Sequence, residues 1–177
     1  MFVAARLPAP VCAELARWAR HVPGGGGMRR LDADAMHLTL CFLGDQPLAA
    51  RDELAAVLGG AAEAVAALGE LVVGAPLWLP PRRPRVLAVE IGDPGGGLRE
   101  LRAALAREIA ATIGWSDGRE RFRPHVTLAR TRPGERRAVA LEPTPSLRFA
   151  CERVALLRSW LEPAGARYEE LASVGGW

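Results

Sequence analysis

The sequence contains no lysine: all 23 basic residues among its 177 are arginine. With many alanines, glycines and prolines, this is typical of a GC-rich coding bias. The formal net charge is only +3, so charge alone demands no acidic partner. Arginine nevertheless presents a planar fork that suits phosphate oxygens. The composition therefore permits a nucleic-acid substrate without requiring one.

Long apolar runs are also missing. No uncharged run approaches the roughly 20 apolar residues of a membrane span. Arg6, two prolines and Glu14 interrupt the N-terminal segment too early for the apolar region of a signal peptide. Half of the residues are apolar, which is enough to form the core of one domain covering 1–177. We expect a cytoplasmic protein that makes no membrane contact.

Cysteine pairs and metal or nucleotide motifs are absent from the sequence. Cys12, Cys41 and Cys151 are odd in number and show no paired spacing, which argues against a disulfide framework. There is no His-Glu-x-x-His, and the glycine runs lack the lysine or the strand-to-helix setting of a phosphate-binding loop. Two histidines supply too few ligands for a catalytic zinc site. We expect no metal and no cofactor.

Histidine is scarce, yet two of the three histidines share one pattern. The stretch MHLTLCFLGD carries His37 and Thr39, and RPHVTLAR carries His125 and Thr127. Side chains alternate along a strand, so the His and Thr of each motif point one way and the intervening apolar residues point into a core. His21, the third histidine, lies at a helix end and has no such setting.

The periodicity of apolar residues predicts mixed structure. We expect strands at 2–7, 36–44, 70–80, 86–92 and 122–130, two or three more from 147 onward, helices at 9–22, 48–68 and 98–113, and mostly loop at 131–145 with room for a short helix. The order strand, helix, histidine strand therefore occurs twice. This repeat favours an α+β chain with two similar lobes about a pseudo-twofold axis.

Facing lobes would bring two imidazoles and two hydroxyls into one cleft. Imidazoles have a pKa near about 6.5, so one can act as base and the other as acid at neutral pH. The threonine hydroxyls can donate to the oxygens of an anion. This set suits a phosphodiester, above all a cyclic one. An RNA-end cyclic phosphate, a small cyclic nucleotide, and a non-catalytic RNA-end-binding module all remain open.

Five stretches of the sequence together resemble the two-histidine phosphoesterases, specifically the RNA 2′,3′-cyclic phosphodiesterases, also called 2′-5′ RNA ligases. These stretches are FVAARLP, HLTLCFLGD, RPRVLAVEI, FRPHVTLAR and LLRSWLEPAGARYEEL. The resemblance implies a bilobal fold with two antiparallel sheets flanking a central cleft and helices outside. It implies metal-independent opening of an RNA-terminal 2′,3′-cyclic phosphate to a 2′-phosphate, with 2′-5′ ligation as the reverse chemistry. We expect a monomer. His37 and His125 would be the acid/base pair, in an order the sequence leaves open, and Thr39 and Thr127 would hold phosphate oxygens.

Residues beside the motifs are further candidates. Arg123 shares parity with His125, and Arg130 matches the family's TLxR ending although strict alternation turns it away; both are expected anion contacts. Alternation also places Cys41 on the cleft face, where many relatives carry a basic residue, and Phe42 in the core. Arginines expected to widen a positive rim are Arg82, Arg83, Arg85, Arg119, Arg121 and Arg123.

Overall fold

The computed structural model describes residues 1–23, 27–116, 118, 122–132, 139–151, 153–162 and 165–175. Its strands are β1 (Phe2–Arg6), β2 (Met28–Arg30), β3 (Leu38–Phe42), β4 (Leu71–Leu79), β5 (Val86–Gly92), β6 (His125–Thr131), β7 (Arg148–Phe149), β8 (Arg153–Glu162) and β9 (Gly165–Gly175). Its helices are α1 (Ala9–His21), α2 (Arg51–Gly60), α3 (Ala62–Ala66) and α4 (Gly97–Ile113), with short 3-10 turns η2 (Ala33–Ala35) and η3 (Leu48–Ala50). The expected α+β class and the three C-terminal strands are confirmed.

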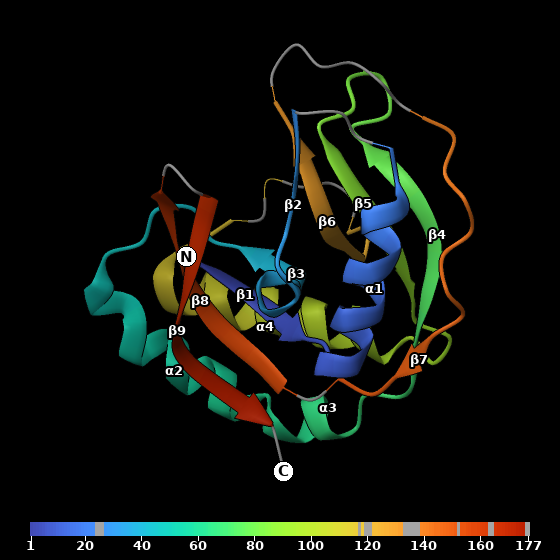
Figure 1. Ribbon diagram of the computed structural model, residues 1–177. Helices are drawn as coiled ribbons and strands as arrows, with labels where there is room; N and C mark the ends of the chain where they lie inside the picture. Colours follow the sequence, from blue (N-terminus) through green and yellow to red (C-terminus); the bar gives the residue numbers. More distant parts are fainter. Residues whose placement is uncertain are drawn as a thin grey trace.

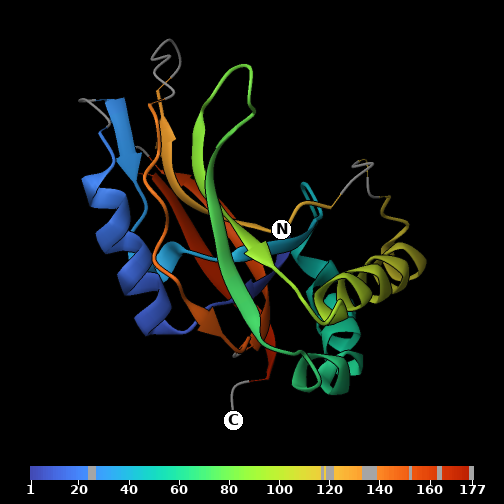
Figure 2. The ribbon, with the colours of Figure 1, turned by 90° about the vertical axis from the view of Figure 1, so that its right-hand side faces the viewer.

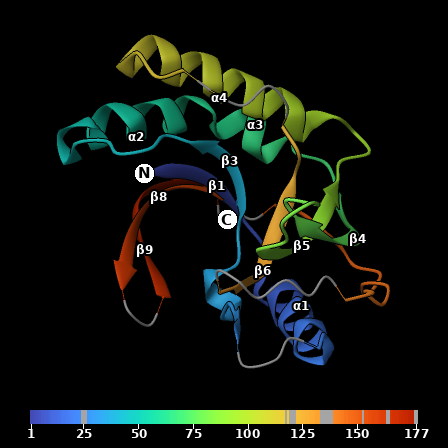
Figure 3. The same cartoon turned by 90° about the horizontal axis from the view of Figure 1, so that it is seen from above.

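The described strands form a strongly curled antiparallel sheet in the order β7-β4-β5-β6-β3-β1-β8-β9, with β2 added beside β6 (Figure 1). The two halves expected as separate sheets meet at a single bridging pair, Leu38 with Val126, between β3 and β6. Figure 3 shows the sheet bending around the space between the halves. The two histidine motifs therefore lie at the junction of the halves.

Helices α1 and α4 each contact the repeat to which they do not belong. The first repeat is β1-α1-β3 and the second is β5-α4-β6. Helix α1 contacts β6 and β2, whereas α4 contacts β3, so each helix packs beside the histidine strand of the other repeat. Figure 2 shows α1 on one side of the strands and α2, α3 and α4 on the other. We propose that residues 1–177 form one domain whose lobes are intertwined in this way.

The longest helix, α4, shows why the local sequence folds as predicted. Leu98, Leu101, Leu105 and Ile109 recur at helical spacing and are all buried. Asp93 accepts hydrogen bonds from the backbone N–H groups of the first turn, at Leu98 (2.9 Å) and Arg99 (3.3 Å). The helix ends at Gly114, whose φ of 65° favours glycine. No helix in the described ranges is long and apolar enough to cross a bilayer.

One expectation about the elements is wrong, and one strand was missed. The single helix expected at 48–68 is interrupted, because Gly59 and Gly60 are poor helix formers and the N–H of Ala61 bonds back to Gly59 and Leu58. The three-residue strand β2 was not expected, because so short a strand has no readable alternation. Residues 133–138, where a short helix had room, lie outside the described residues, and 139–145 hold no helix.

The bridging pair between the halves should be a sensitive point for stability. Leu38 is 1% exposed, and its truncation to alanine leaves a cavity where β3 meets β6. We expect Leu38→Ala to lower the free energy of unfolding by about 2–5 kcal/mol, measured by urea denaturation. The control is Leu48→Ala in η3, where the side chain is 53% exposed and a change within about 0.5 kcal/mol is expected. Equal effects in the two variants would contradict this role.

Candidate active site

Both His-x-Thr motifs line one cavity of ≈ 550 Å³. The wall is completed by side chains from β1, β2, β4–β5 and the C-terminal hairpin. The lining residues are Phe2, Arg29, Leu31, His37, Thr39, Phe42, Leu79, Pro80, Val86, His125, Thr127, Arg130, Ser159, Ala166 and Tyr168. This volume lies within the range of small-molecule sites. The structure therefore brings His37, His125, Thr39, Thr127 and Arg130 together.

A β-bulge in each histidine strand changes the alternation after the motif. Val3 pairs with Cys41 and Ala4 with Thr39, so Leu40 is an extra residue in β3. In β6, Leu87 pairs with Ala129 and Ala88 with Thr127, so Leu128 is extra. The extra residue is the leucine of His-x-Thr-Leu in both strands. Two consecutive buried residues then follow each threonine, and the next side chain turns back to the cavity.

The bulges correct two expectations and support a third. Cys41 is 1% exposed and faces the core, not the cleft, and burial raises its pKa to about 11. Phe42, expected in the core, is 54% exposed and lines the cavity. Arg130 lines the cavity for the same reason, although strict alternation turned it away.

The antiparallel register fixes how the motifs face each other. Since Leu38 pairs with Val126, His37 lies across from Thr127 and Thr39 across from His125. Because the strands are antiparallel, the residues that follow Thr127 in β6 lie beyond His37 and not beyond Thr39. Arg130 therefore lies on the His37 side of the motifs.

Both imidazoles are held in the same way. His37 Nδ1 lies 2.8 Å from the carbonyl of Ala35, and His125 Nδ1 lies 2.8 Å from the carbonyl of Arg123. A carbonyl only accepts, so Nδ1 carries the hydrogen in each ring. Nε2 is then the nitrogen available to a ligand, with a lone pair when the ring is neutral. Each His-x-Thr motif thus presents an oriented base or acid to the cavity.

The surroundings of His37 are strongly apolar. Its ring centroid lies 4.9 Å from the rings of both Phe2 and Tyr168, the latter edge-on. Desolvation by this burial lowers the pKa of His37 to about 4; the positive charges of Arg6, Arg130 and His125 act in the same direction. The resting imidazole of His37 is therefore neutral at physiological pH.

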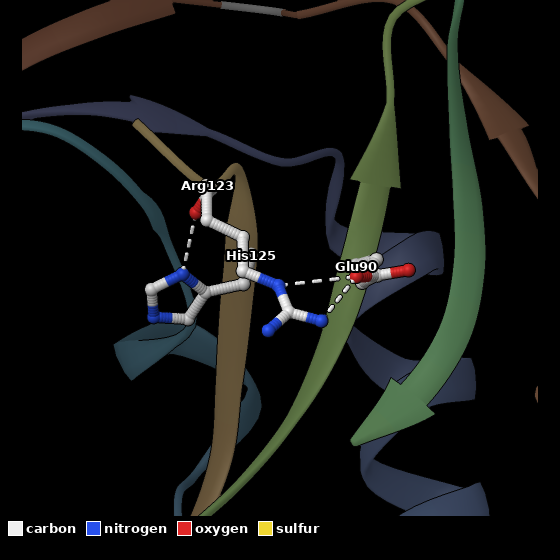
Figure 4. Close-up of polar contacts among 3 residues, drawn as sticks. All are labelled: Glu90, Arg123 and His125. Atoms are coloured by element: carbon white, nitrogen blue, oxygen red, sulfur yellow. Dashed lines mark hydrogen bonds and ion pairs between the residues drawn. The ribbon is translucent and has the colours of Figure 1, made fainter. Parts of the chain in front are cut away.

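Arg123 is placed differently from the expectation. It is not among the described residues that line the cavity. Its guanidinium donates to the carboxylate of Glu90 at 2.6 and 3.1 Å (Figure 4), and Glu90 is the register partner of His125. Its backbone carbonyl orients His125, so the ion pair braces the segment that holds this ring. A substrate contact by Arg123 stays a prediction.

Several residues of the cavity wall were not predicted from the sequence. Of the two arginines on the described wall of the cavity, Arg29 and Arg130, only Arg130 was expected. The described members of the expected rim, Arg82, Arg83, Arg85 and Arg123, do not line it, and Arg119 and Arg121 lie outside the described residues. Tyr168, the single tyrosine of the chain, and Phe2 were not predicted either. Only the resemblance of the C-terminal hairpin to a family could have indicated Tyr168.

The described residues contain no group of three or more His, Cys, Asp or Glu side chains arranged to hold a metal ion. No disulfide joins Cys12, Cys41 and Cys151.

Comparison with known proteins identifies the family. The model of the 2′-5′ RNA ligase superfamily matches residues 7–160. The chain belongs to this superfamily. The RNA 2′,3′-cyclic phosphodiesterase of Escherichia coli (strain K12) is 34% identical over 131 residues, 73% of this chain and 70% of that relative. A protein of the same name from Aeropyrum pernix is 34% identical over 121 residues, 66% of this chain and 64% of that relative.

Two solved structures share the fold. TT0787 of Thermus thermophilus superposes with a TM-score of 0.84 at 26% identity, covering 98% of this chain and 96% of that one. E. coli LigT in complex with 3′-AMP superposes with a TM-score of 0.78 at 28% identity, covering 99% and 96%. Both likenesses extend over the two halves of the sheet.

The buried His37 gives a prediction about pH. Its pKa is about 4 in the folded protein and about 6.5 when unfolded, so the unfolded chain binds more protons between these values. The contribution of His37 to stability is complete above pH 6.5 and is lost as pH falls toward 4, by up to about 3 kcal/mol. Urea denaturation against pH should show this loss, and His37→Asn should remove it. A variant with the wild-type pH dependence would contradict the assignment.

Proposed function

We propose that this protein is an RNA 2′,3′-cyclic phosphodiesterase that opens an RNA-terminal cyclic phosphate to a 2′-phosphate. The observation that carries the proposal is the convergence of both His-x-Thr motifs on one cavity, with Nε2 of each ring available to a ligand. Its relatives of known name carry this activity in their names. We propose that the chemistry uses no metal, because two positioned imidazoles supply both proton transfers.

The proposed reaction is an in-line displacement at phosphorus. A water oxygen bonds to phosphorus while one imidazole takes its proton, and the bond from phosphorus to O3′ breaks while the other imidazole protonates O3′. The phosphate remains on O2′, so atoms and charge balance. The hydroxyls of Thr39 and Thr127 donate to the non-bridging oxygens as negative charge develops there. The 2′-5′ ligation expected from the family is the same displacement with a ribose 5′-hydroxyl in the place of water: its oxygen bonds to phosphorus and O3′ leaves. Cleavage of a 2′-5′ linkage is this step reversed.

We assign His37 as the base and His125 as the acid. His37 is neutral in the resting enzyme because burial beside Phe2 and Tyr168 lowers its pKa. Its ring lines the cavity, so its Nε2 can accept a proton from a water bound there. Binding an anionic phosphate places negative charge near this ring, which raises its pKa toward the value a useful base requires. His125 then supplies the proton to O3′.

The other interpretations make different demands on the same cavity. A small cyclic nucleotide would need only the central motifs, whereas an RNA chain would also use the arginines on the cavity wall. A binding module would need no matched pair of oriented imidazoles. The cytoplasmic location, the monomeric state and the relevance of ligation stay predictions.

The primary test is turnover of a short RNA that ends in a 2′,3′-cyclic phosphate, in the presence of a chelator. We expect a 2′-phosphate product, and we expect His37→Ala and His125→Ala each to lower kcat by about 100-fold or more. Thermal unfolding and circular dichroism check that the variants fold. A 3′-phosphate product would reverse the leaving oxygen, and chelator-sensitive turnover restored by zinc would overturn the metal-free chemistry.

The assignment of acid and base can be tested with a leaving group that needs no proton. With a p-nitrophenyl phosphodiester of a nucleoside, we expect His125→Ala to lose at least about 10-fold less activity than it loses with RNA. His37→Ala should lose as much activity with either substrate, because water must still be deprotonated. The opposite pattern in the two variants would exchange their roles.

A further inference from the structure

The cavity that holds the two motifs has an annex on its His37 side. This smaller pocket, of ≈ 70 Å³, shares Arg29, Leu31, Arg130, Ala166 and Tyr168 with the main cavity. Its remaining described wall is formed by Arg30, Asp32 and Ala35. The space can take a phosphate group but is too small for a second nucleoside.

Two arginines face each other where the annex joins the cavity. Arg29 on β2 is the register partner of Arg130 on β6, and both side chains are exposed. Two guanidinium groups at neighbouring positions present planar forks that together can bind several oxygens of one phosphate. The mouth of the annex therefore suits an anion.

The position of this pair relative to the reacting phosphate is set by β6. Because Leu128 is an extra residue, Arg130 occupies the next position after Thr127 on the cavity face. Positions on one face of a strand are spaced by about 7 Å. This is the length of a ribose with its two ester linkages, so a phosphate held by Thr127 and one held by Arg130 can belong to the same nucleotide.

We propose that Arg29 and Arg130 form a second phosphate subsite, which binds the phosphodiester on O5′ of the terminal nucleotide. The inference rests on the proposed function and extends it: the preferred substrate is an RNA chain of at least two nucleotides. Arg130 was expected as an anion contact from the sequence, whereas Arg29 and the pairing of the two come from the register. Asp32 is the one carboxylate on the described wall of the annex; it is exposed.

The test compares three substrates that differ only at O5′. They are a nucleoside 2′,3′-cyclic phosphate, the same compound with a 5′-phosphate, and the corresponding dinucleotide with a cyclic phosphate end. We expect kcat/KM to be higher for the two substrates that carry a second phosphate. Arg29→Ala should reduce this advantage by about 10-fold and make the salt dependence for the dinucleotide less steep by about 0.7 in log–log slope. Arg29→Lys should restore part of the advantage.

The matched control is Arg99→Ala on α4, which removes the same charge from a helix that does not line the cavity; the advantage should persist. An equal loss for all three substrates, or no loss, in Arg29→Ala would overturn the subsite. A gain confined to the 5′-phosphorylated compound would overturn its assignment to an RNA chain. If wild type turns over none of the three, the proposed function fails. Calorimetric dissociation constants of the matching 2′-phosphate products then decide the subsite: an advantage for the dinucleotide that Arg29→Ala reduces supports it, and no such reduction overturns it.

Discussion

Strands β3 and β6 each carry one residue more than β1 and β5, the strands with which they pair at the bulge. That extra leucine determines which side chains line the cavity. Leu40 and Leu128 both pack into the core and push the following residue there as well. The side chains that come next, Phe42 and Arg130, are thereby returned to the face that holds the histidines. Without the bulges a buried thiol and an alanine would occupy these positions, and the cavity would lose its aromatic ring and one of its two described guanidinium groups.

The pseudo-twofold repeat supplies two equivalent His-x-Thr motifs, but displacement at phosphorus needs one base and one acid. The repeat itself treats the rings alike, since each gives its Nδ1 hydrogen to the carbonyl two residues earlier. The difference has two sources: the C-terminal hairpin, which lies outside the repeat, places Tyr168 against His37, and Phe2 of β1, within the first repeat, covers the same ring. The symmetric arrangement is thus made asymmetric by a strand that the repeat does not contain and by an aromatic residue in only one of its copies.

The sequence was sufficient for the parts that depend on local pattern and not for those that depend on neighbouring strands. The two motifs, their shared face, and the helices α1 and α4 follow from alternation and helical spacing within a single segment. A bulge cannot be read in this way, because it is defined by the partner strand, so Cys41 and Phe42 were exchanged. Arg29 was missed because β2 is only three residues long, and the position of Arg29 beside the cavity follows only from the pairing of β2 with β6.

The two adjacent arginines of β2 have different roles: Arg30 stabilises the fold, and Arg29 lines the cavity. Arg30 contributes to the wall of the annex but not to that of the main cavity, and its guanidinium donates to the carbonyls of Ala19 (2.8 Å) and Val22 (2.7 Å) at the end of α1. A fork can satisfy several carbonyls at a helix end, where a single ammonium would place its charge less well. Arg30 thus fixes β2 against α1, and this rigid placement holds Arg29 opposite Arg130. The absence of lysine therefore suits both tasks, whatever its origin in codon usage.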